Sequence, residues 1–298
     1  MMEPGVYTGI GNEEYHKGPG LSSSDLKLLA RSPLHYKTTK AMPSKETDAM
    51  RLGTAVHCAV LEPDRFEKEY IAAPDGIDRR TKAGKAQWAE LEATGKIVLS
   101  REDAQTVQGM ADSLKRHSTA SKLFTGGVAE QSCYWNQTVY YADTSAEILC
   151  KCRPDYIKDI SGGYVIVDLK TTLDAREKTF RGRAYWDLGY HLSAAHYFTG
   201  LTAIRGAHPQ AFIFVAVEKE PPYAVNVFQS GRDFLDEGCA EAEELYKVYA
   251  ACMASGKWPG YPDVIRELNL PWGAERGLSN VGGENGSEQY WNSDAVNV

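Results

Sequence analysis

The chain has 298 residues, of which 43% are hydrophobic and 24% are charged. This composition is typical of a globular protein that can form one large domain or two small ones. No apolar run approaches the roughly 20 residues that span a bilayer. The first residues, Met1–Gly5, hold neither a basic region nor an apolar segment. We therefore expect no secretory signal and a cytoplasmic location.

The formal net charge is −7, which argues against a protein that coats DNA indiscriminately. It is compatible with an enzyme that concentrates positive potential in a channel, because a phosphate track needs only a local basic patch. Two stretches are locally basic: Arg79, Arg80, Lys82 and Lys85 in one, and Arg176, Lys178, Arg181 and Arg183 in the other. Each stretch is either such a track or a solvated surface.

Six cysteines are spread along the chain, and none belongs to a Cys-x-x-Cys pair. Cys150 and Cys152 are two residues apart on a predicted strand and share a face. No second pair lies near them in the sequence, so a zinc or iron–sulfur centre is not expected. We expect reduced thiols that are mostly buried.

The N-terminal part, about residues 20–120, is predicted to be mainly helical. A run of serines supplies an N-cap for a helix over 26–30, which ends before Ser32-Pro33. Residues 36–47 are predicted to form a loop, and a second helix covers about 47–61. Small residues in this second helix permit close approach to a sheet or to DNA.

Short strands and helices alternate in the next part of the chain. The strands are predicted at 70–73 and 97–99, and the helices at 85–94 and 102–117. Ser100 and Asp103 approximate a capping box for the last of these helices. Its apolar stripe is expected to face the core.

From about residue 126 to 230 the pattern indicates a sheet. A hairpin is predicted around Asn136-Gln137, followed by a strand over Glu147–Ile157 and a second strand over Tyr164–Thr172. Gly162-Gly163 between these strands is typical of a hairpin turn.

The last elements are helices and two further strands. They are predicted as a helix at 184–199, strands at 212–217 and 223–228, and a long helix at 232–255. Trp186 and Leu192 of the first helix are expected to pack in the core. The continuous apolar run of the first strand indicates burial on both faces.

The central hairpin brings three charged side chains together. Side chains alternate along a strand, so Asp168 and Lys170 share a face. Folding the hairpin about Ile160–Ser161 places Asp155 nearly opposite Ile166–Val167. This is one diagonal step from Asp168, roughly 5–8 Å between Cβ atoms.

Two carboxylates at this distance repel each other unless a cation compensates their charge. Mg²⁺ prefers oxygen ligands and is commonly held by one or two carboxylates plus a substrate phosphate. The alternative is a surface hairpin with a Lys–Asp ion pair. Pro154-Asp155 and the apolar run Val165–Val167 favour the metal site.

The pattern of Pro-Asp, a spacer and Asp-x-Lys resembles that of the PD-(D/E)xK nucleases. More closely, the chain resembles the exonuclease VIII (RecE-type) nuclease domain of phages and prophages. The blocks that carry this resemblance span about residues 7–230 and are Gly20–Leu26, Ser32-Pro33, Gly53–His57, Arg153–Asp155, Asp168–Thr172 and Tyr190–Tyr197.

The resemblance implies an α/β fold with a restriction-endonuclease-like core, in which helices flank a mixed β-sheet. It implies one nuclease domain over residues 1–265, with its helical part at about 20–120, its sheet at about 126–230 and its C-terminal helix at about 232–255. A flexible tail is expected at 273–298.

The resemblance also implies which residues form the site. Asp155, Asp168 and Lys170 would be catalytic, and the metal would be held by His57, Asp155, Asp168 and the Leu169 carbonyl. The alternative for His57 is a structural or surface histidine. Glu130 is either an outer carboxylate of the metal site or a surface residue. The implied DNA contacts are Arg153, Thr171, Ser193 and Tyr197. Ser193 stands where the family usually has glutamine.

The implied activity is an exodeoxyribonuclease that uses Mg²⁺, for which Mn²⁺ can substitute. It would degrade linear duplex DNA 5′→3′ in the cytoplasm of a bacterial host. The product is a 3′ single strand for a recombination annealing protein, and the implied assembly is a ring-like homo-oligomer.

Two alternatives remain open. The first is another nuclease task on this fold: a structure-specific endonuclease, a single-strand exonuclease or a CRISPR-adaptation exonuclease, the last disfavoured because a cysteine cluster is lacking. The second is a non-catalytic DNA-binding module, which the presence of Asp155, Asp168 and Lys170 together disfavours. A serine hydrolase elbow and a nucleotide-binding P-loop are both absent from the sequence.

Overall fold

The structure is a computed structural model that describes residues 2–43 and 47–268. The chain divides into two units, Met1–Gly260 and Tyr261–Val298. All the helices and strands named below belong to the first unit. The described part of the second unit, residues 261–268, contains no helix or strand. The tail predicted at 273–298 lies outside the described residues.

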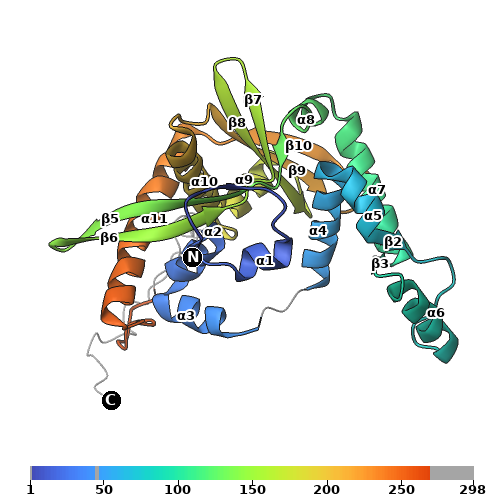
Figure 1. Cartoon of the computed structure of the whole chain (residues 1–298), viewed down its shortest axis with the longest axis horizontal. Coiled ribbons are helices and arrows are strands. Elements are labelled where there is room, and N and C mark those ends of the chain that lie inside the picture. The colour runs from blue at the N-terminus through green and yellow to red at the C-terminus, as the bar shows by residue number, and fades with distance from the viewer. Residues whose placement is uncertain (1, 44–46, 269–298) are drawn as a thin grey trace, which may run out of the picture. The chain divides into compact units, whose positions relative to one another are not determined.

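A five-stranded mixed sheet forms the centre of the first unit, with strand order β10-β9-β8-β7-β4 (Figure 1). Its strands are β4 (Val128–Ala129), β7 (Tyr156–Ile160), β8 (Gly163–Thr172), β9 (Ala211–Glu218) and β10 (Val225–Gln229). β8 and β9 are parallel, and the other pairs are antiparallel. β8 is the middle strand, and its apolar residues are buried on both faces, as expected for a strand covered from two sides.

A second, antiparallel sheet has the order β1-β5-β6. Its strands are β1 (Gly5–Tyr7), β5 (Ser132–Tyr141) and β6 (Thr144–Cys152). The turn predicted around Asn136-Gln137 is wrong, because both residues pair with β6 within the ladder. The chain turns instead at Ala142-Asp143, where Ala142 has a left-handed φ of 49°. Polar residues on the solvent side of this long hairpin gave a false turn signal.

The predicted continuous strand over Glu147–Ile157 is also wrong. It is two strands in different sheets, β6 and β7, separated by Arg153-Pro154-Asp155. Pro154 has no N–H to donate, so it cannot continue a ladder and it marks the crossing. The chain crosses between the same two sheets a second time at Glu130-Gln131, between β4 and β5.

The β7–β8 hairpin has a different register from the predicted one. Ile160 pairs with Gly163, so the turn is Ser161-Gly162 and Gly163 begins the strand. Tyr156 therefore pairs with Val167, and one further step along this register brings Asp155 to Asp168. The observed register thus aligns the two carboxylate positions more closely than the predicted one.

One face of the central sheet is covered by α4 (Asp48–Leu61) and α7 (Arg101–Arg116). Ala55 and Val56 of α4 are fully buried in one apolar cluster with residues of β8 and β9, among them Leu169. The helix predicted at 47–61 is confirmed, and its small side chains allow this close packing. Thr47 caps α4, and Ser100 caps α7 by accepting from the Asp103 N–H.

The other face is covered by α2 (Ser23–Arg31), α9 (Glu177–Trp186), α10 (Tyr190–Arg205) and α11 (Arg232–Ser255). The single helix predicted over 184–199 is wrong. It is two helices, α9 and α10, separated by a turn at Gly189, whose φ of 55° suits glycine. Leu192 is buried as expected, whereas Trp186 is 81% exposed and not in the core.

The remaining elements are α1 (Asn12–Lys17), α3 (Pro33–Ala41), α5 (Pro63–Glu69), β2 (Tyr70–Ala72), α6 (Lys82–Glu92), β3 (Ile97–Leu99) and α8 (Ser118–Leu123). α3 occupies much of the predicted loop over 36–47, because Ser32 caps it and Pro33 stands at its first turn. Within the described ranges, no helix has the length and apolarity to cross a bilayer.

Candidate active site

Two carboxylates lie at the two chain crossings between the sheets. Glu130 follows β4, and Asp155 precedes β7. The Glu130 N–H donates to the Asp155 carbonyl over 3.1 Å, so the main chain fixes one crossing against the other. Glu130 has a left-handed φ of 50°, an uncommon and costly conformation for a residue with a side chain. Such strain is found preferentially at functional sites.

His57 completes a group of potential metal ligands. It projects from α4, and its Nδ1 lies 3.5 Å from Asp155 Oδ1. One ligand atom each of His57, Glu130 and Asp155 lies within 4.8 Å of the others. Within residues 2–43 and 47–268, no other set of three His, Cys, Asp or Glu residues has this geometry. One imidazole nitrogen and two carboxylates form a donor set that suits a divalent cation.

The charge state of this group shows how its members depend on one another. Burial raises the pKa of Glu130 to about 7, and the nearby Asp155 carboxylate adds to this rise. Burial also acts to raise the pKa of Asp155, but His57 and Lys170 outweigh it, and the pKa of Asp155 is lowered. The pKa of His57 is raised, because Asp155 outweighs the opposing effect of burial. A cation here would relieve the repulsion between the two carboxylates.

Asp168 and Lys170 share a face of β8, as the alternation of side chains predicted. Lys170 Nζ lies 2.5 Å from Asp168 Oδ2, and the Asp168 side chain is only 3% exposed. Burial acts to lower the pKa of Lys170, but Asp168 and then Asp155 outweigh it and raise this pKa. Lys170 is therefore held as a charged ammonium. Burial raises the pKa of Asp168, against the attraction of Lys170.

Leu169 connects this strand to the metal-ligand group. Its N–H donates to Asp155 Oδ2 over 2.6 Å, which orients the carboxylate toward His57 with its other oxygen. The structure thus links the predicted residues Asp155, Asp168, Lys170 and His57, and it adds Glu130 to the innermost group. The roles predicted for Asp168 and for the Leu169 carbonyl as metal ligands stay predictions.

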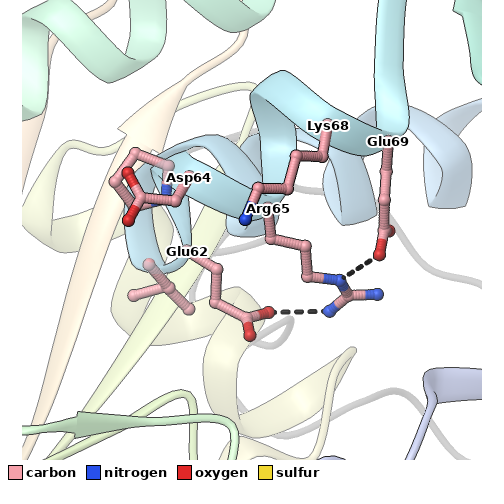
Figure 2. Close-up of a pocket in the computed structure, with 7 residues that line it drawn as sticks. Glu62, Asp64, Arg65, Lys68 and Glu69 are labelled. Carbon is pink, nitrogen blue, oxygen red and sulfur yellow. Dashed lines mark hydrogen bonds and ion pairs between the residues drawn. The ribbon is translucent and has the colours of Figure 1, made fainter.

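A cavity of about 350 Å³ opens onto this site. His57, Glu130 and Asp155 line it together with residues of α1 and α10, including Tyr15 and Tyr197. A neighbouring hollow of about 460 Å³ lies at the end of α4 and along α5. Figure 2 shows that Arg65 bridges Glu62 and Glu69 there, at 2.7 and 2.9 Å. Glu62 and Arg65 line both spaces, so this ion-paired rim borders the candidate site.

The four predicted DNA contacts have different surroundings. Arg153 is buried and uses its guanidinium inside the protein, donating to Ser132 Oγ and to the Ile10 carbonyl. Ser193 is buried in α10, whereas Thr171 and Tyr197 are partly exposed. Tyr197 and Arg153 line the cavity. Contact with DNA stays a prediction for all four.

Within the described ranges of the chain, neighbouring acids pair with three of the four basic residues in the second stretch and with one of the four in the first. Arg176, Arg181 and Arg183 form ion pairs with Asp174, Glu177 and Asp187. In the first stretch, Arg80 pairs with Asp78, and Arg79 lies over the Trp88 ring. These contacts favour the interpretation of both stretches as solvated surface.

Two residues near Lys170 were not singled out from the sequence. Lys170 Nζ lies 5.0 Å from the centroid of the Tyr190 ring, and Lys27 Nζ lies 5.2 Å from the same centroid. Tyr190 stands at the start of a block that resembles the RecE-type pattern. Lys27 gave no signal, since one lysine on an amphipathic helix is ordinarily a surface residue.

The class of PD-(D/E)xK-like domains is defined by a mixed sheet with helices on both faces, with Asp168 and Lys170 on its central hairpin and Asp155 directly before it. The chain belongs to the family described as a PDDEXK-like domain of unknown function (DUF3799), whose model matches residues 22–268. This places it in the PD-(D/E)xK nuclease superfamily. The family description includes no RecE-type specificity.

One solved structure agrees with this fold. A protein from Eubacterium rectale, described provisionally as an exonuclease, matches 92% of this chain and 100% of its own length, with 16% identity and a TM-score of 0.54. SSO0001 matches 66% of this chain and 86% of its own, with 14% identity and a TM-score of 0.27, too low to carry an argument. Among curated proteins, none matches the chain.

Proposed function

We propose that the protein is a metal-dependent exodeoxyribonuclease that degrades linear double-stranded DNA. The observation that carries this proposal is the junction of the two sheets, where His57, Glu130 and Asp155 form a ligand group beside the Asp168–Lys170 pair. This donor set fits Mg²⁺ or Mn²⁺. His57, Glu130 and Asp155 would hold the cation, which would supply charge neutralisation at the phosphate and activation of water.

Lys170 would act on the phosphate as a fixed positive charge. Its raised pKa keeps it protonated, so it can stabilise the negative charge that develops on phosphoryl oxygens. A protonated ammonium cannot take a proton from the attacking water. Asp168 holds Lys170 in place through the 2.5 Å ion pair. This contact restricts the side-chain conformations that a lysine otherwise adopts.

The finer features of the activity are supported by the resemblance to RecE-type nucleases. These are 5′→3′ polarity, a 3′ single-stranded product for an annealing protein, a ring-like homo-oligomer and action in a bacterial cytoplasm. The provisional description of the Eubacterium rectale protein as an exonuclease supports attack from DNA ends.

The test is degradation of linear duplex labelled at the 5′ or the 3′ end, with a covalently closed circle of the same sequence in parallel. Asp168→Asn and Lys170→Met should each lower the rate with Mg²⁺ on the order of a thousandfold, since each removes stabilisation of several kcal/mol. Lys158→Met is the matched control on the neighbouring β7 and should retain native activity.

Each part of the proposal can fail separately. Native rates in both site variants would overturn the site. Cleavage of the circle as fast as the linear duplex would overturn exonuclease action and indicate an endonuclease. The order in which the two labels are released reports the polarity.

A further inference from the structure

Lys27 and Lys170 lie over one tyrosine ring. Lys27 comes from α2 and Lys170 from β8, and their ammonium nitrogens lie 5.2 and 5.0 Å from the Tyr190 centroid. The Lys27 stem lies along Gly189: a Cβ at this glycine would stand 3.4 to 3.6 Å from Lys27 Cγ, Cε and Cδ. The stem is thus packed, and the position of the ammonium beside Tyr190 is determined by the fold.

The two lysines differ in how their charge is balanced. Lys170 is paired with Asp168 at 2.5 Å. Lys27 makes no ion pair or hydrogen bond with the described residues; its ammonium lies over the Tyr190 ring, and it is attracted by the Asp168 carboxylate that is paired with Lys170. Burial and the repulsion from Lys170 lower the pKa of Lys27 to about 8. Asp168 is thus shared between two ammonium groups, and a partly buried ammonium in this position is stabilised when a further anion binds beside it.

Lys170 connects the ligand group with Lys27. The charge of Lys170 acts on Asp155 and His57, and its ammonium lies over the Tyr190 ring. Lys27 lies over the same ring. With the scissile phosphate at the ligand group and Lys170, a second ammonium over the same ring is a place where a neighbouring phosphate of the strand can bind.

We propose that Lys27, held over the Tyr190 ring, forms a phosphate-binding subsite for the phosphate that neighbours the scissile one on the same DNA strand. This inference rests on the proposed nuclease function. The subsite fixes the register of the strand, because phosphate contacts position DNA without reading its sequence. Lys27 is therefore a positioning residue for the cleavage reaction.

The first test is the salt dependence of duplex binding in EDTA, where the DNA is bound without being cut. Lys27→Met keeps most of the stem and removes the charge, and Lys27→Arg restores it. We expect Lys27→Met to reduce the slope of log K against log salt by about 0.9, the loss of one phosphate contact, and Lys27→Arg to retain the native slope.

Lys37→Met is the matched control. Lys37 Nζ also lies 5.2 Å from an aromatic centroid, that of Trp258, but it stands on α3, away from Lys170. Lys37→Met tests whether removal of any lysine that lies over an aromatic ring changes the slope of log K against log salt. Thermal denaturation checks that each variant is folded, and Lys27→Gln replaces Lys27→Met if the latter unfolds.

The second test places a single neutral methylphosphonate at successive linkages of the cut strand. At the contacted linkage, it should weaken native binding but add little to the effect of Lys27→Met, since both remove the same contact. Duplexes with a 5′-phosphate or a 5′-hydroxyl show whether the bound phosphate is terminal or internal.

Three results overturn the inference. These are a native slope in Lys27→Met, an equal loss of slope in Lys37→Met, or additive effects at every linkage. Failure of the native protein to bind or cut DNA would instead overturn the proposed function, which the native control shows directly.

Discussion

The Glu130 N–H donates to the Asp155 carbonyl over 3.1 Å, and this bond joins the two places where the chain passes between its sheets. The two carboxylates are thus brought together by main-chain geometry. Glu130 adopts a φ of 50° to make this contact. The position combines a strained backbone with a buried acid beside another acid, and both features cost stability.

Two substitutions of Glu130 should distinguish the cost of its left-handed backbone from the effect of losing its carboxylate. Glu130→Gly relieves the left-handed backbone, whereas Glu130→Ala keeps it, so we expect the glycine variant to be more stable by about 1 kcal/mol. Denaturant unfolding measures the difference. Both variants should lose Mn²⁺ affinity to the same extent. An alanine variant as stable as the glycine variant would show that the left-handed conformation carries no strain.

Metal affinity should depend on pH through the same residue. The pKa of Glu130 is about 7 in the metal-free protein, so a proton must leave for a cation to bind at lower pH. We expect Mn²⁺ binding to weaken from pH 8 to pH 6, by about tenfold from Glu130 alone. Calorimetry in buffers of different ionisation enthalpy measures both the affinity and the released proton.

Glu130→Gln is the control for this pH effect. It should bind Mn²⁺ more weakly at pH 8 and show a shallower decline toward pH 6. His57, whose pKa is also raised, contributes a decline of the same sign in both proteins. Parallel pH profiles for the native protein and Glu130→Gln would contradict the assignment of Glu130 as a ligand.

The predictable part of the site was the part with local signals. Alternation along one strand placed Asp168 and Lys170 on one face, whereas His57 was assigned from the resemblance of Gly53–His57 to the RecE-type pattern. The inference from the strand needs only the period of the element and the direction of its side chains. It predicts which side chains share a face, but the distances between them depend on the strand register.

The rest depended on contacts between distant segments. Pro154 was available as a signal for a strand break, but the sequence does not say that two sheets meet there. The conformation of Glu130 and the approach of Lys27 to Tyr190 arise only when α2, β4 and α10 are packed. Predicting them requires the tertiary structure, since no local propensity distinguishes these residues from surface ones.

Close packing of α10 against α11 gives a test of the fold. A Cβ at Gly238 would lie 2.3 Å from the His191 carbonyl oxygen, so Gly238→Ala must push the helices apart. We expect a loss of about 2 kcal/mol or more in unfolding free energy. Gly182, in α9, has nothing within 4 Å of such a Cβ. Gly182→Ala should gain about 0.5–1 kcal/mol from helix propensity, and equal effects at both sites would contradict this packing.

His196 should make the fold sensitive to acid. It is fully buried; its Nε2 lies 2.9 Å from the Lys151 carbonyl and its Nδ1 lies 2.7 Å from the Tyr246 hydroxyl. A neutral ring satisfies both by donating from Nε2 and accepting at Nδ1. Burial lowers the pKa of His196 to about 4, although the Lys151 carbonyl opposes this.

The folded pKa of His196 lies below the unfolded value of about 6.5, so the unfolded chain binds more protons between these values. The stability that the neutral histidine contributes is therefore complete above about pH 6.5 and is lost as the pH falls toward 4, by about 3 kcal/mol in total. His196→Gln, which cannot titrate, should be less stable at pH 7 but should lose about 3 kcal/mol less between pH 7 and pH 4. Urea unfolding of both proteins at several pH values measures this difference, and parallel curves would show that folding does not lower the pKa of His196.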